Sequence, residues 1–310
     1  MKQWLEKNPW IWPLIGSIVL WVLIGALSGN VRVAVLVSSV SLASFSILLG
    51  FGQMMVVTSG NGAIDLSATY ILTFAAYIAC SFMEVNILLG FLVAMAVGAL
   101  VGVVNALINI YLKVPVMITT LATGYIVYSM ILIFAPMMKT LPNSSLVKFV
   151  IGYTFGISNL TYVCVVVMIL LYILLYKSKY GKQLHAVGQN RLAAKYVGVS
   201  VTKIIIKTFA LSGMIAAFTG ALCGAYIGGA FQDMSNAYFL PSITAVLVGG
   251  TSAAGGKSNV VGAFFGAIMM SLLTTFLNVT RLEPGYQNLV QGVVLILVLI
   301  ASVSKKAGHA

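Results

Sequence analysis

Few side chains of this sequence could take part in acid–base, nucleophilic or metal chemistry. Of its 310 residues, five are Asp or Glu, two are His and three are Cys. Asp65 lies where an apolar stretch resumes, and because an ionisable group is costly to bury there, a functional role is the first hypothesis. The structural alternative, which we favour, is that its carboxylate caps amide groups at a helix start, with Ser67 assisting.

The His and Cys residues show no spacing typical of a metal site, a disulfide framework or a catalytic group. They are Cys80, Cys164, Cys223, His185 and His309. Ligand and nucleophile motifs place such residues at short, fixed intervals, which are missing here. The sequence therefore predicts neither an enzyme nor a protein with a cofactor of its own.

The string GTSAAGGKS at residues 250–258 nearly matches a phosphate-binding loop. That motif needs Gly, four residues and then Gly-Lys-Ser; the required Gly falls on Thr251, and Gly250 is one place too early. We therefore expect that the chain does not hydrolyse ATP itself. Lys257 more simply extends its charged end to the edge of a membrane.

Other polar candidates carry hydroxyl or amide groups inside apolar stretches. Together with Asp65 and Ser67 they form a candidate solute path: Gln53, Asn61, Asn105, Asn109, Thr119, Thr120, Thr123, Ser242 and Thr244. Such groups suit a neutral polyol, because they exchange hydrogen bonds without a fixed charge. Hydrogen bonding between helices accounts equally well for any single one of them.

The elements that must position these residues are membrane-spanning helices. Apolar residues make up 61% of the chain and charged residues 7%, and the mean hydropathy is +1.07; soluble domains carry about 25% charged residues. Since one crossing needs about 20 apolar residues, the sequence predicts an all-α polytopic membrane protein with about ten spans. They lie near residues 10–29, 34–57, 64–83, 86–111, 116–135, 159–176, 205–228, 239–254, 259–279 and 286–303.

The distribution of Lys and Arg predicts the orientation of these spans. Ten crossings with both termini in the cytoplasm place thirteen of the 17 basic residues inside: Lys2, Lys7, Lys113, Lys177, Lys179, Lys182, Arg191, Lys195, Lys203, Lys207, Lys257, Lys305 and Lys306. Only Arg32, Lys139, Lys148 and Arg281 remain outside. This asymmetry is typical of the positive-inside rule. The net charge of +12 is therefore a topology signal rather than a sign of nucleic-acid binding.

The predicted organisation is a single transmembrane domain over residues 1–310, inserted in the bacterial inner membrane, with the charged start and first span as a retained signal anchor. Residues 136–158 form an extracytoplasmic loop or short helix, and residues 177–204 form the longest polar, cytoplasmic stretch. Two breaks rich in Gly, Ser and Thr, at 56–63 and 247–255, raise the hypothesis of an internal repeat. Small residues, including Gly213, Gly220, Gly262 and Gly266, predict close helix packing within the chain rather than a dimer seam.

Within the cytoplasmic stretch, the pattern predicts a short amphipathic helix over about 191–197 that ends at Gly198, a natural helix terminator. Such a helix can lie parallel to the membrane and present one face to a cytoplasmic partner. The alternative is an ordinary basic loop held near anionic lipid.

Three blocks of the sequence resemble the ribose and simple-sugar permeases of ABC importers, in the branched-chain amino acid/ribose permease superfamily. They are IDLS at 64–67, GQN at 188–190 with Ala-Ala at 193–194 and Gly-Val at 198–199, and VGGTS at 248–252 with GGK at 255–257. Their order and separation fit that family over roughly residues 40–303. The family usually has Thr-Gly-Gly before the first block, whereas residues 58–63 here read TSGNGA, which indicates a looser turn.

This resemblance implies a ten-helix subunit that pairs with a second copy or homologue, binds two cytoplasmic ATPase subunits and receives solute from an extracytoplasmic binding protein. It also implies that the cytoplasmic block is the coupling element that docks onto the ATPase. The residues concerned here are Asn190, Arg191, Ala193, Ala194, Lys195 and Gly198. ATP would be bound by the partner subunit, and movement of the coupling element would switch access to the path.

We therefore expect the permease subunit of an ATP-driven importer for a small polar solute, first of all a ribose-like or other simple sugar. Nucleosides, sugar-like signalling molecules and branched-chain amino acids remain alternative solutes. The alternative class is a secondary transporter driven by an ion gradient. It would use buried ionisable residues, of which the spans offer almost none beyond Asp65.

Overall fold

The computed structural model describes residues 8–29 and 32–307, with side chains described up to residue 300. The predicted charged start of the anchor and His309 lie outside the described residues. The α-helices are α2 (Ile11–Leu27), α3 (Val33–Thr58), α4 (Ala68–Met83), α5 (Ile87–Tyr111), α6 (Val116–Phe134), α7 (Ser144–Ile151), α8 (Asn159–Tyr172), α9 (Lys179–Gln189), α10 (Arg191–Tyr196), α11 (Val201–Ile227), α12 (Asn236–Val248), α13 (Val260–Val279) and α14 (Pro284–Ala307). A 3-10 turn, η1 (Ala135–Met137), follows α6, and a π turn, η2 (Ile173–Lys177), extends α8.

The all-α prediction is confirmed, except for one antiparallel hairpin of β1 (Tyr153–Thr154) and β2 (Ile157–Ser158) that the sequence did not reveal. Ten helices coincide with the ten predicted spans. Six segments are long and apolar enough to cross a membrane, while α2, α4, α12 and the apolar part of α14 are shorter apolar helices. The two shortest, α4 and α12, each adjoin one of the two glycine-rich breaks.

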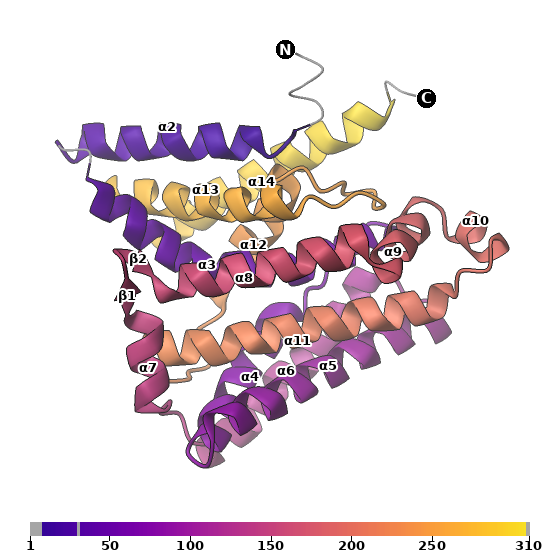
Figure 1. Cartoon of the computed structure of the whole chain (residues 1–310), viewed down its shortest axis with the longest axis horizontal. Coiled ribbons are helices and arrows are strands. Elements are labelled where there is room, and N and C mark those ends of the chain that lie inside the picture. The colour runs from indigo at the N-terminus through magenta and orange to yellow at the C-terminus, as the bar shows by residue number, and fades with distance from the viewer. Residues whose placement is uncertain (1–7, 30–31, 308–310) are drawn as a thin grey trace.

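The span α3 lies between two groups of helices (Figure 1). It contacts α12 and α13 on one side, where α2 and α14 also pack, and it contacts α11 and α4 on the other, where α5 and α6 pack. Accordingly, nearly every side chain from Ser41 to Ser59 is buried. Polar groups carried by α3 can therefore meet both halves of the bundle.

Two short helical regions lie at opposite ends of the bundle (Figure 1). The helix α7 and the hairpin β1–β2 lie at one end, and α9 and α10 lie at the other. They correspond to the predicted loops 136–158 and 177–204, although the sequence did not predict α9. That the α7 end is extracytoplasmic and the α10 end cytoplasmic stays a prediction.

The expected packing of small residues within the chain is confirmed. A Cβ on Gly213 would lie 2.0 Å from the carbonyl oxygen of Gly98 in α5, and one on Gly220 would lie 2.0 Å from that of Leu72 in α4. Gly262 and Gly266 contact the chain of Gly249 and Ala245 in the same way. These glycines thus let helices of one chain approach backbone to backbone.

Candidate functional site

The first break follows α3 and contains three successive residues with left-handed backbone. Their φ angles are 85° at Gly60, 60° at Asn61 and 63° at Gly62. Asn tolerates this region better than other residues with a side chain. The looser turn expected from the sequence is therefore a tight left-handed reversal, which Gly and Asn permit.

Asp65 closes the turn that leads into α4. Its Oδ1 accepts hydrogen bonds from the backbone N–H of Ser67 (2.9 Å) and from Ser67 Oγ (2.6 Å), and Ser67 is the residue before α4. Gln53 of α3 holds the same residue through its backbone, because Nε2 donates to Asp65 O (2.5 Å) and Oε1 accepts from Asp65 N (3.1 Å). This geometry favours a local structural role, close to the capping interpretation.

The same network reaches α5 and α6. Asn105 Nδ2 of α5 donates to Ser67 Oγ (2.8 Å), and Asn105 Oδ1 accepts from Thr123 Oγ1 of α6. Thr120 Oγ1 accepts from the N–H of Leu66 (3.0 Å). The structure thus brings six of the polar candidates together, all of them buried, and uses them to fix the first break against α3, α5 and α6.

Two buried polar atoms, one on the first break and one on α11, take no part in this hydrogen-bond network. Among the described residues, neither Asp65 Oδ2 nor Ser212 Oγ of α11 has a hydrogen-bond partner, although both are buried. Ser212 was not predicted from the sequence, because a single Ser in a long apolar helix gives no signal. Ser212 lies beside the Asp65 carboxylate, so these two polar groups face each other between the first break and α11.

Four of the remaining polar candidates lie apart from this network. Ser242 and Thr244 are buried in α12, where Ser242 Oγ donates to Phe239 O of its own helix (2.9 Å). Thr119 borders the network, since its backbone O accepts from Thr123 Oγ1 (3.0 Å), while its own Oγ1 is buried without a partner among the described residues. Asn61 and Asn109 instead line a cavity near α10. The single path expected from the sequence is therefore distributed over three places.

The first break meets the second and third sequence blocks at four glycines, Gly60, Gly188, Gly255 and Gly256, which we call the glycine junction. A Cβ on Gly188 of α9 would lie 1.9 Å from Thr58 O and 2.5 Å from Gly256 N, and one on Gly255 would lie 2.2 Å from the Cα of Gly60. The N–H of Gly256 donates to Thr58 O (2.9 Å), joining the two breaks directly. Only glycine fits where three backbones approach this closely.

Side chains of α8 and α9 bind the second break at the same point. His185 Nε2 and Ser258 Oγ are hydrogen-bonded (2.8 Å), and Tyr176 OH donates to Ser258 O (2.8 Å). Neither His185 nor Ser258 was a candidate, because their spacing of 73 residues carries no motif. The helix that leads to α10 is therefore tied to both breaks.

The helix α10 has well-defined ends. Asn190 caps its start by accepting the N–H of Ala193 (3.0 Å). At its other end, Gly198 is left-handed with φ 81°, its N–H donates to Lys195 O (3.0 Å), and the N–H of Val199 donates to Ala194 O (3.0 Å). These bonds form a Schellman motif, so the predicted end of this helix at Gly198 is confirmed.

Apolar side chains cover the outer surface of α10. Leu192 is 68% exposed, Tyr196 88% and Val197 78%, whereas Ala194 is buried at 3%. Exposed apolar groups gathered on a protruding helix are typical of a protein-interaction site. These three residues were not predicted from the sequence. Tyr196 and Val197 follow Leu192 by four and five residues, a spacing that places all three on one helical face.

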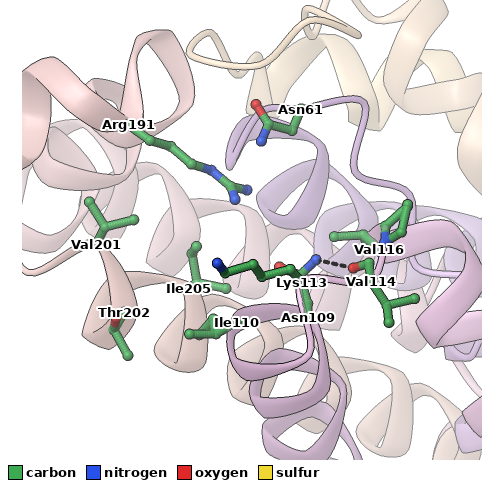
Figure 2. A pocket seen from close by; sticks show the side chains of 11 residues that line it. Asn61, Asn109, Ile110, Lys113, Val114, Val116, Arg191, Val201, Thr202 and Ile205 are labelled. Atoms are coloured by element: carbon green, nitrogen blue, oxygen red, sulfur yellow. Dashed lines mark hydrogen bonds between the residues drawn. The ribbon is translucent and has the colours of Figure 1, made fainter.

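A cavity of about 480 Å³ lies between α10, the start of α11, the α5–α6 loop and the first break. Figure 2 shows its lining, which includes Asn61, Asn109, Lys113 and Arg191. The Nε of Arg191 is buried without a partner among the described residues, and burial lowers the pKa of this guanidinium from its ordinary value. This cavity is therefore polar and positively charged.

In the part of the chain that the structure describes, no cluster of three or more His, Cys, Asp or Glu could hold a metal ion. The three cysteines are buried and unpaired. The ten apolar helices of the described residues, with glycine-rich irregular backbone beside two of them, instead define the class of membrane-embedded transport proteins, in which irregular backbone lines a path near the bilayer centre.

Comparison with known proteins identifies the family. Residues 30–299 match the family model described as "Branched-chain amino acid transport system / permease component", and the chain belongs to this family. It is a multi-pass membrane permease, a transport subunit rather than an enzyme, and such components work with an ATPase and a binding protein. The resemblance seen in the sequence is confirmed.

Several curated relatives are similar over most of their length. The ribose import permease protein RbsC of Escherichia coli K12 is 29% identical over 98% of this chain and 96% of its own. The galactose/methyl galactoside import permease protein MglC of the same strain is 30% identical over 82% of each chain. The fructose import permease protein FrcC of Rhizobium meliloti is 28% identical over 96% of this chain and 86% of its own. Among solved structures, none matches the chain.

Proposed function

We propose that this chain is the permease subunit of an ATP-driven importer for a simple sugar, with a ribose-like sugar as the leading solute. The observation that carries the proposal is the similarity, at 28–30% identity over 82–98% of this chain, to import permeases that are named for ribose, galactose and fructose. The polar candidates agree with it, because all except Asp65 carry neutral hydroxyl or amide groups. The solute passes between this subunit and a second copy or a homologue.

In this proposal α10 docks onto the ATPase subunit through Leu192, Tyr196 and Val197. Ala193 and Lys195 lie on the same short helix, while Asn190 and Gly198 fix its two ends. ATP-driven movement of α10 reaches both breaks through α9 and the glycine junction. Opening of the first break then exposes the buried network to the solute.

The solute is tested with the complete importer, reconstituted in proteoliposomes with its ATPase and binding protein. We expect ATP-dependent uptake of labelled ribose that exceeds uptake of galactose, fructose and leucine. Preferred uptake of leucine would contradict the sugar assignment. Uptake by the permease alone under an ion gradient would contradict the proposed class.

The docking surface is tested with Tyr196→Glu, which places a charge on an exposed apolar position. We expect normal membrane insertion, loss of ATPase co-purification and at least a tenfold loss of uptake, since a buried charge at an interface costs several kcal/mol. Ser200→Glu adds the same charge four residues away at an exposed position and serves as the control. Unchanged ATPase binding in Tyr196→Glu would disprove this docking surface.

A further inference from the structure

The cavity beside α10 has the properties of an anion site. Lys113 comes from the α5–α6 loop and Arg191 from α10, and both side chains extend into it (Figure 2). Val201 and Thr202 also line it, and they begin α11, where Ser200 makes no side-chain capping bond. The free N–H groups of that first turn add positive potential to the two cations.

No acidic side chain of the described chain balances these charges. The one ion pair found among the described residues joins Lys139 to Glu84 near the α7 end. Among the described residues, no acidic side chain acts on the pKa of Arg191, which burial alone lowers. A guanidinium whose Nε is buried without a partner favours an anionic acceptor from outside the chain.

The other walls of the cavity are apolar. Ile110, Val116 and Ile205 line it beside the cations. Next to them, Tyr111 is 70% exposed and Leu112 68% exposed, at the point where the predicted span α5 ends. Cations above an apolar wall at a membrane boundary fit an amphiphile better than a freely soluble ion.

We propose that this cavity binds the headgroup of an anionic phospholipid from the cytoplasmic leaflet. The phosphate lies between Lys113 and Arg191, with the amide of Asn61 beside it, and the glycerol end lies against Ile110 and Ile205. Asn109 Nδ2 already donates to Val114 O (2.7 Å), so it has one N–H left to offer. Because Arg191 is the first residue of α10, the lipid links the docking helix to the α5–α6 loop and the first break. Asn61 and Asn109 are also candidates for the solute path, so the test below measures lipid binding and not uptake, and either assignment can fail without the other.

The test is native mass spectrometry of the full chain titrated with phosphatidylglycerol or with phosphatidylcholine of the same acyl chains. We expect the wild type to retain phosphatidylglycerol preferentially. Lys113→Gln with Arg191→Gln should weaken this binding roughly 25-fold, because each basic residue near a membrane surface contributes about a factor of five. Lys179→Gln with Lys207→Gln removes two exposed cations outside the cavity, at the same predicted cytoplasmic end, and should leave affinity within about twofold.

Lys113→Gln alone keeps the proposal testable if the double variant does not fold, since Lys113 is exposed; it should weaken binding about fivefold. Equal retention of phosphatidylglycerol by the cavity variants and the control would overturn the proposal. Retention of inorganic phosphate in place of the lipid would assign the cavity to a soluble anion. Loss of the lipid on adding the ATPase would assign the cavity to an acidic side chain of that subunit. Retention of phosphate alone and loss of the lipid to the ATPase would each overturn the lipid proposal.

Discussion

The two glycine-rich breaks look alike in sequence but are held in different ways. Side chains hold the first break, after α3: Asp65, Ser67 and Asn105 connect it to α5 and α6. The second break, after α12, is held to α8 and α9 through Ser258 and to itself through the bond from Asn259 N to Thr251 Oγ1 (3.2 Å). The two breaks touch each other, but this contact alone does not show that they are copies of one repeated unit. The internal repeat therefore stays a hypothesis.

This difference indicates how a displacement of α10 spreads. α9 is bonded by side chains to the second break, whereas it meets the first break only by backbone contact at Gly60 and Thr58. A pull on α9 is therefore expected to move the second break directly. The first break can move only if hydrogen bonds of its buried network break. We therefore expect the first break to resist displacement more than the second.

The largest effect is expected from Gly188→Ala, which removes the contact that the two breaks share. The added Cβ would overlap Thr58 O and Gly256 N, and because these are backbone atoms they cannot move aside alone. We expect a loss of about 3 kcal/mol in the free energy of unfolding, or no folded protein. Thermal unfolding in detergent, followed by size exclusion, measures it.

The control for this substitution is Gly292→Ala in α14, where an added Cβ meets nothing within 4 Å. Alanine favours the helix over glycine by about 1 kcal/mol, so its stability should be unchanged or slightly higher. Equal stability of the Gly188→Ala and Gly292→Ala proteins would show that the glycine junction tolerates a methyl group.

An intermediate effect on stability is expected from substitutions of Asp65, a buried carboxylate that the first break has and the second lacks. Asp65→Ala removes the acceptor of Ser67 N and Oγ and should cost about 2 kcal/mol in stability. Asp65→Asn keeps an acceptor at the same place and should stay within about 1 kcal/mol of the wild type. Urea or thermal unfolding of both proteins checks this order.

Transport by Asp65→Asn separates the two roles considered for this residue. If the carboxylate only shapes the turn, uptake by this variant stays near that of the wild type. A stable Asp65→Asn protein that no longer transports would instead show that the charge acts on the solute or its path.

The smallest effect is expected from Ser258→Ala in the second break. It removes the hydrogen bond to His185 but keeps the bond from Tyr176 to the backbone, so stability should fall by about 1 kcal/mol. Ser129→Ala removes only a bond within α6 and should change less. Uptake that falls while ATP hydrolysis persists would support transmission through this break; unchanged uptake would argue against it.

Much of the site was predictable only as a set of candidates. Gly198 predicted the end of α10, because a left-handed glycine acts within a few residues, whereas only the structure shows that Asn190 caps its start. His185 gave no signal, since its partner Ser258 is far away in the sequence, and neither did Ser212, a single Ser in a long apolar helix. Most of the path candidates are buried, but Asn61 is exposed, and the sequence did not separate Ser242 in α12 from the network around Asp65.

The sequence by itself determined the apolar helices and the short helix α10. A chain in lipid must satisfy its backbone within each helix, so length and hydropathy decide where the crossings lie. Only the tertiary structure decided that Gly60, Gly188 and Gly255 meet, and that six polar residues close the first break. A glycine in the sequence indicates that another group approaches its backbone closely, but it does not identify that group. Contacts between segments that lie far apart in the sequence depend on how the helices pack.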